Sequence, residues 1–167
     1  KSNLPLYKFL GLKSSSLKPG SFTIAIDELK NLPQKIAEAK DFKILKIKLG
    51  TKHDEEIVRI VKNETDKKLY ADANQGWLDK TQAHELIHML EENRFELVEQ
   101  PMPVGSAEDD MRWLKEKSAL PILADEAVKR FADLEKAKEL FHGINIKLMK
   151  STGIAEALRM IYKAREM

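Results

Sequence analysis

The sequence predicts an α/β fold, specifically a partial (β/α) barrel of the TIM type with about six βα units. Short apolar runs rich in β-branched residues alternate with amphipathic charged stretches, which is typical of parallel strands connected by helices. The polar residues that close these runs recur about every 25 residues. No glycine-rich phosphate-binding turn follows the first run, so the repeat favours a barrel over a dinucleotide-binding sheet.

Six apolar runs bounded by turn residues or charges are the predicted strands. In chain order they cover residues 22–26, 44–49, 68–73, 95–99, 121–125 and 144–149, and the helical patterns that follow them cover 28–40, 53–63, 80–93, 107–117, 131–141 and 154 to the end. Several helices begin with capping signals. Asp79 and Ser106 precede two of them, and the acidic residues after Thr51 lie where the helix dipole favours negative charge.

The composition describes one domain of 167 residues with 29 Lys plus Arg, 27 Asp plus Glu and no cysteine. The absence of cysteine excludes a disulfide scaffold and a cysteine zinc ribbon, and makes a reducing, cytoplasmic setting the default expectation. Basic and acidic residues are mixed, so the sequence predicts neither a nucleic-acid nor a membrane partner. Residues 1–12 do not have the pattern of a signal peptide.

Lysines lie on the inward face of two predicted strands. Aliphatic residues alternate with Lys46 and Lys48 in the run at 44–49, and with Lys147 in the run at 144–149. Both faces of a parallel barrel strand are buried, so the aliphatic face packs on the helices and the lysines point inward. The three intervening strands end in Asp72, Glu99 and Asp125.

These charges predict a metal centre with two bases. Unpaired buried charges are costly, and three carboxylates at adjacent strand ends form an all-oxygen site that suits Mg²⁺ rather than zinc. Strands two and six lie opposite each other in an eight-stranded barrel, so their lysines would remove a proton from one face of a substrate carbon and return one to the other, with the cation stabilising the enolate. We expect mutual repulsion, partial burial and the cation to lower the pKa values of Lys46, Lys48 and Lys147 towards neutrality.

Five short motifs carry a resemblance to a known family. They are Lys-Ile-Lys at 46–48, Asp-Ala-Asn-Gln-Gly-Trp at 72–77, Glu-Gln-Pro at 99–101, Ala-Asp-Glu at 124–126 and Asn-Ile-Lys-Leu-Met-Lys at 145–150. Together they resemble the muconate-lactonising subgroup of the enolase superfamily, and within it they are most similar to the dipeptide epimerases, including the L-Ala-D/L-Glu epimerases.

The resemblance implies an isomerase that epimerises the carbon next to a carboxylate of a dipeptide. It implies Mg²⁺ bound by Asp72, Glu99 and Asp125, with Lys48 and Lys147 as the acid/base residues. Lys46 would lie beside the substrate carboxylate and help to hold the enolate. The family usually has two glycines after the sixth strand, whereas Ser-Thr-Gly at 151–153 keeps only the second.

Other functions stay open. Cycloisomerisation or dehydration of the o-succinylbenzoate synthase type would use the same lysines, metal and enolate. His84-Glu85-Leu86-Ile87-His88 matches the H-E-x-x-H pattern of zinc metalloproteases, but both histidines lie about 120° from the apolar stripe of their helix, which predicts a solvent-facing or rim position. An inactive barrel fragment is a third possibility. Trp77 either lines the mouth of the site or packs in the core.

The length limits the expected architecture, because a complete barrel takes about 250 residues. We therefore expect residues 1–20 to be a linker from an N-terminal capping domain that is absent, and residues 21–167 to be a partial barrel catalytic domain without the last strands. An open sheet exposes two edges and an apolar interior. The sequence thus predicts aggregation or association of such a chain, in the simplest form a homo-oligomer, or loss of activity.

Overall fold

The computed structural model describes residues 3–13 and 17–167 and has the predicted α/β architecture. Six strands form one parallel sheet in chain order, which is the arrangement of a partial (β/α) barrel. The strands are β1 (Ser21–Ile24), β2 (Ile44–Lys48), β3 (Lys68–Asp72), β4 (Phe95–Glu99), β5 (Ile122–Ala124) and β6 (Gly143–Ile144). Each predicted strand is therefore present.

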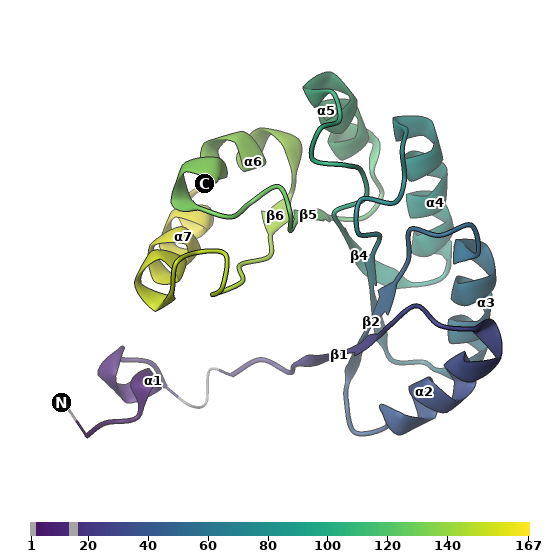
Figure 1. Cartoon of the computed structure of the whole chain (residues 1–167), viewed down its shortest axis with the longest axis horizontal. Coiled ribbons are helices and arrows are strands. Elements are labelled where there is room, and N and C mark those ends of the chain that lie inside the picture. The colour runs from purple at the N-terminus through teal and green to yellow at the C-terminus, as the bar shows by residue number, and fades with distance from the viewer. Residues whose placement is uncertain (1–2, 14–16) are drawn as a thin grey trace.

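The helices that connect the strands lie on the outer side of the sheet (Figure 1). They are η2 (Leu29–Asn31), α2 (Leu32–Glu38), α3 (Asp54–Glu64), α4 (Lys80–Glu92), α5 (Glu108–Lys117), η3 (Phe131–Asp133), α6 (Leu134–Leu140) and α7 (Ile154–Glu166). Two predicted helices thus begin with a turn of 3₁₀ helix. Asp79 caps α4 as predicted, since its carboxylate accepts hydrogen bonds from the amides of Thr81 and Gln82. Ser106 does not cap α5, whose N-cap is Ala107.

The alternation predicted for β2 is present. Leu45, Ile47 and Leu49 are buried in the core against the helices, whereas Lys46 and Lys48 on the other face are partly exposed. This division follows from the strand period of two, because one face meets the apolar stripes of the helices and the other faces the inside of the curved sheet. The inner face is therefore the polar one.

A β-bulge in β4 determines which residues of β3 and β4 lie beside each other. Leu69 and Tyr70 are consecutive in β3, but they pair with Phe95 and Leu97, so Glu96 is an extra residue in β4. Beyond the bulge, Asp72 pairs with Glu99. Without the extra residue Asp72 would pair with the residue before Glu99, and the two carboxylates would lie on opposite faces of the sheet. The bulge thus brings both acids to the inner face.

The sixth strand is shorter than predicted. β6 pairs only with β5, and it does so through Gly143 and Ile144. Because β5 ends at Ala124, the residues after Ile144 have no strand beside them, and they form a loop that leaves Leu148 and Met149 exposed. The predicted strand over 144–149 was wrong in length, although the loop still carries Lys147 towards the centre.

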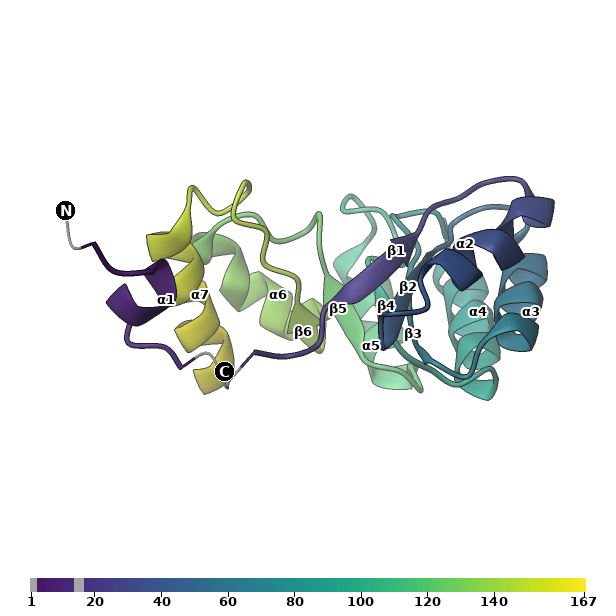
Figure 2. The same ribbon diagram turned by 90° about the horizontal axis from the view of Figure 1, so that it is seen from below.

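The segment before β1 stands apart from the barrel helices. It contains a short helix, α1 (Leu6–Phe9), without a buried residue. Figures 1 and 2 show α1 at the far end of this segment, on the same side of the molecule as α7. The expected linker over 1–20 stays a prediction, and its residues 1–2 and 14–16 lie outside the described part. No helix in the described ranges combines the length and apolar character that a membrane crossing requires.

Candidate active site

The sheet register brings three of the predicted site residues into one row. Lys48 on β2 pairs with Asp72 on β3, and Asp72 pairs with Glu99 on β4. Asp125 follows the last residue of β5. Since these strands are parallel, their carboxyl ends meet at one edge of the sheet, which is where the (β/α) barrel places active sites.

The three carboxylates form a compact buried group. Asp72 and Asp125 are fully buried and Glu99 is 4% exposed. One oxygen from each residue lies within 4.8 Å of the others. A group of three carboxylate oxygens at this spacing fits a hard cation that prefers oxygen ligands, such as Mg²⁺, with positions left for water or substrate. The donor set is thus suitable for the predicted metal.

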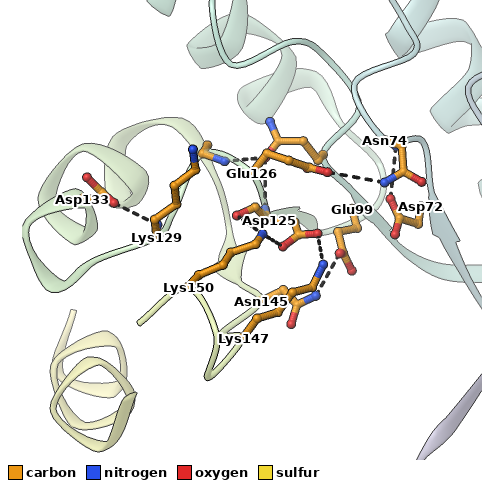
Figure 3. A network of polar contacts seen from close by, with 12 residues as sticks. Asp72, Asn74, Glu99, Asp125, Glu126, Lys129, Asp133, Asn145, Lys147 and Lys150 are labelled. Atoms are coloured by element: carbon orange, nitrogen blue, oxygen red, sulfur yellow. Dashed lines mark hydrogen bonds and ion pairs between the residues drawn. The ribbon is translucent and has the colours of Figure 1, made fainter. Parts of the chain in front are cut away.

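Four lysines compensate the charge of this carboxylate group. Lys46 Nζ lies 2.8 Å from an oxygen of Asp72 and 2.8 Å from one of Glu99. Lys48 Nζ lies 2.7 Å from Asp72 and 2.6 Å from Oδ1 of Asn74. On the far side, Lys147 and Lys150 each pair with a different oxygen of Asp125 (Figure 3). The two predicted bases, Lys48 and Lys147, therefore approach the carboxylates from opposite ends of the group.

The carboxylates raise the pKa values of two of these lysines, Lys46 and Lys147. Burial lowers the pKa of Lys46, but its hydrogen bonds to Asp72 and Glu99 outweigh burial and raise it above the usual lysine value. Burial likewise lowers the pKa of Lys147, and the pairing with Asp125 raises it overall. Pairing with the carboxylates thus outweighs burial at both residues, and the shift towards neutrality, which was expected in the presence of a bound cation, stays a prediction.

The carboxylates differ from one another. Burial raises the pKa of Glu99 above its ordinary value, against hydrogen bonds from Lys46 and Asn145 that lower it. For Asp125 burial also acts to raise the pKa, but the hydrogen bonds from Lys147 and Lys150 prevail and lower it. Two lysines on one carboxylate thus hold Asp125 as an anion, the form that ligates a cation.

Two polar residues that the sequence analysis did not single out complete the inner surface. Asn145 Nδ2 donates to Glu99 Oε1 at 2.8 Å, as Figure 3 shows, and so orients that carboxylate from the loop after β6. Lys150 contacts Asp125 from the same loop. Both residues belong to the motif at 145–150 that contributed to the family resemblance, and the alternation that predicts an inward Lys147 places Asn145 on the same face.

A buried polar anchor supports the loop after Lys48. The carboxylate of Asp54 accepts hydrogen bonds from the backbone amides of Gly50 and Thr51, both at 2.9 Å, and from Nε1 of Trp77 at 2.8 Å. Trp77 is 1% exposed. Trp77 therefore packs in the core and does not line the mouth of the site. Its hydrogen bond to Asp54 connects the loop after β3 to the loop after β2.

The H-E-x-x-H motif does not form a metal site. His84 packs on the ring of Trp113 at a centroid distance of 5.5 Å, and His88 contacts Glu91 and Glu92 on the exposed side of α4. Glu85 is exposed. Within the described residues, the only group of three or more potential ligands close enough to share a metal is that of Asp72, Glu99 and Asp125. The histidines thus have the solvent-facing or rim position that the helix pattern predicts, which argues against a zinc protease.

Comparison with known proteins agrees with this geometry. Residues 28–167 match the enolase C-terminal domain-like family. The chain belongs to this family. Membership of the enolase family confirms the resemblance inferred from the five motifs, and it explains why the charged residues gather at the carboxyl ends of the strands.

Several relatives in this family carry names that refer to dipeptides. The L-Ala-D/L-Glu epimerase of Bacteroides thetaiotaomicron is 42% identical over 158 residues, which are 94% of this chain and 41% of that protein. The dipeptide epimerase of Cytophaga hutchinsonii, crystallised with Mg and the dipeptide D-Ala-L-Val, has 30% identity and a TM-score of 0.88 over 97% of this chain and 46% of its own. The chain thus spans less than half the length of these relatives.

Proposed function

We propose that this chain is the main part of the active site of a Mg²⁺-dependent dipeptide epimerase. The observation that carries the proposal is the placement of Lys48 and Lys147 at opposite ends of a buried group of three carboxylates. An epimerase that works in both directions needs an acid/base group on each face of the reacting carbon. The names of the relatives support a dipeptide as the substrate.

In the proposed mechanism Asp72, Glu99 and Asp125 would hold the cation. When bound, Mg²⁺ supplies positive charge that offsets the negative charge developing on the substrate carboxylate as the α-proton leaves. Lys46, which bridges Asp72 and Glu99, would contact that carboxylate and add to the same stabilisation.

The two remaining lysines would move the proton. The step requires one of Lys48 and Lys147 as a neutral amine, so for Lys147 the pairing with Asp125 that raises its pKa has to be released first. The neutral amine takes the α-proton from one face of the carbon, while the other lysine is an ammonium group and donates a proton to the opposite face. The C–H bond broken on one side is replaced by one on the other, so configuration inverts with no net change in composition. The reverse direction exchanges the two roles.

The boundaries of the domain are part of the proposal. We infer that residues 1–20 link a capping domain to the barrel, and that residues 21–167 supply about six of the eight βα units. The share of the relatives that the chain covers supports this. A cytoplasmic location, a homo-oligomer and the absence of a nucleic-acid partner stay predictions.

Hydrogen–deuterium exchange at the α-carbon tests the proposed activity. The complete protein that contains this chain is incubated with L,L and epimeric dipeptides in D₂O with Mg²⁺. We expect α-deuteration with inversion, abolished by removal of the metal. Lys48→Ala and Lys147→Ala should each lower exchange by about 10²- to 10⁴-fold, each for only one of the two epimers, because each lysine serves one face.

Two control variants separate the alternatives. Lys52→Ala removes an exposed lysine near the site and should leave exchange unchanged, as should Glu85→Gln in the H-E-x-x-H motif. If no dipeptide exchanged its α-proton in the presence of the metal, a cycloisomerase or a dehydratase of the o-succinylbenzoate synthase type, which forms an enolate from another carboxylate, would be favoured. Exchange that survives in both lysine variants, or that continues without metal, would contradict the proposal.

A further inference from the structure

One buried glutamine at the end of β4 is hydrogen-bonded through its side chain to the segment that carries Asp125. Gln100 directly follows Glu99 and is 1% exposed. Its Oε1 accepts hydrogen bonds from the backbone amides of Asp125 at 3.0 Å and Ala127 at 3.1 Å, and its Nε2 donates to the carbonyl oxygen of Met102 at 3.1 Å. All the polar atoms of the side chain are therefore engaged within the protein.

The backbone of Gln100 extends the same connection to both neighbouring strands. Its amide donates to the carbonyl oxygen of Leu123 on β5 at 2.8 Å, and its carbonyl oxygen accepts from the amide of Gln75, after β3, at 2.8 Å. Gln100 also has a φ of 39°, in the left-handed region that a non-glycine residue adopts at a cost. Such a conformation persists where surrounding contacts hold it in place.

We propose that Gln100 is a positioning residue that sets how Asp125 approaches Asp72 and Glu99. The side chain fixes the backbone of 125–127, and with it the direction in which the Asp125 carboxylate leaves β5. Gln100 itself contacts neither a substrate nor a metal in this proposal. The proposal rests on the metal site put forward above, and it adds the residue that gives the site its spacing.

The chemistry of the position favours glutamine. An apolar side chain of similar length would leave the buried N–H of Asp125, the partly buried N–H of Ala127 and the carbonyl oxygen of Met102 without this partner, and unpaired buried polar groups are costly. A glutamate would still accept from the amides of Asp125 and Ala127, but it could not donate to Met102. The amide is the group that satisfies the donors and the acceptor together.

Mn²⁺ binding and amide exchange test this role. In Gln100→Met we expect Mn²⁺, followed by the electron paramagnetic resonance of the free ion, to bind about 10- to 100-fold more weakly than in the wild type. The amides of Asp125 and Ala127 should also exchange with deuterium faster than in the wild type. Gln100→Glu keeps the acceptor, so those two amides should stay protected.

A matched control distinguishes positioning from general loss of stability. Ile36→Ala removes buried packing from α2, which lies beside β1 and α3 at the other end of the sheet, so it should lower the denaturation midpoint but leave Mn²⁺ affinity and both amides unchanged. Wild-type affinity in Gln100→Met, or equal loss of affinity in Ile36→Ala, would overturn the role of Gln100. If the wild type itself bound no Mn²⁺, the metal site would fail, and the amide exchange of the metal-free variants would still decide whether Gln100 fixes 125–127.

Discussion

Gly50 permits the tight turn that follows Lys48. Its φ is +91°, and a Cβ at this position would lie 2.2 Å from the carbonyl oxygen of Ala73 and 3.1 Å from the Cα of Gly76. The added Cβ would thus clash with backbone atoms, and no side-chain rotation could relieve the clash. The turn holds the loops after β2 and β3 together on the side of the site where Lys48 lies.

Replacing Gly50 by alanine is expected to destabilise the protein. Gly50→Ala combines a disfavoured φ with a clash against backbone, so the free energy of unfolding should fall by about 2–4 kcal/mol. Urea denaturation measures this change. The control is Gly105→Ala, where a Cβ meets nothing within 4 Å, and we expect it to stay within about 0.5 kcal/mol of the wild type. Equal stability of both variants would contradict the close approach of the two loops.

His142 gives the protein a pH-dependent contact at the opposite end of the strands. Its Nδ1 accepts a hydrogen bond from the backbone amide of Ile122 at 3.0 Å. Burial lowers the pKa of His142 below its ordinary value, and the charge of Lys115 lowers it further. The folded protein thus favours the neutral imidazole, which is the form able to accept this hydrogen bond.

The sign of the pH effect follows from this preference. The unfolded chain binds the proton at about pH 6.5, before the folded protein does, so the stability from His142 is present above that pH and is lost as pH falls below it. His142→Asn keeps an uncharged acceptor. Denaturation midpoints measured between about pH 7.5 and pH 5.5 should therefore fall less steeply in the variant than in the wild type. Identical slopes would show that His142 does not contribute.

At the scale of elements, the repeat was predictable because each βα unit has its own local signal. The helices α3, α4 and α5 agree closely with the predicted ranges, since apolar periodicity and the residues at their starts specify them locally. The bulge at Glu96 was not predicted, because it depends on which residue of β3 each residue of β4 meets. The end of β6 likewise depends on the length of its neighbour β5 rather than on its own apolar run.

In the candidate site, too, the features that depend on local sequence were predictable and those that depend on contacts between strands were not. The carboxylates and the inward lysines could be found from the ends and the alternation of strands, and the structure brings them together. The direction in which the pKa values of Lys46 and Lys147 shift could not be predicted from the sequence, since it depends on distances between side chains from different strands. Gln100 was missed for a related reason. The two amides that bond to its Oε1 lie 25 and 27 residues further along the chain, and no spacing within the sequence predicts that contact.

At the scale of the whole molecule, the sheet is open. Among the described residues β1 pairs only with β2 and β6 only with β5, so each end of the sheet presents an edge. Apolar side chains are exposed near both ends, with Ile26 after β1 and Met149 after β6. Open edges and exposed apolar groups favour pairing with another chain.

We therefore expect the 167-residue polypeptide, prepared alone, to self-associate. Its weight-average mass, measured by light scattering after gel filtration, should rise through a dilution series towards higher concentration. Thr23→Lys places a charge on the edge strand β1, at the exposed position that pairs with Lys46 on the inner face, and should lower association, because charged edge residues oppose strand pairing. Glu85→Gln, at an exposed position on α4 between the central strands β3 and β4, is the control and should associate as the wild type does. A monomer at every concentration would show that the N-terminal segment or the loop after β6 already protects the edges of the sheet.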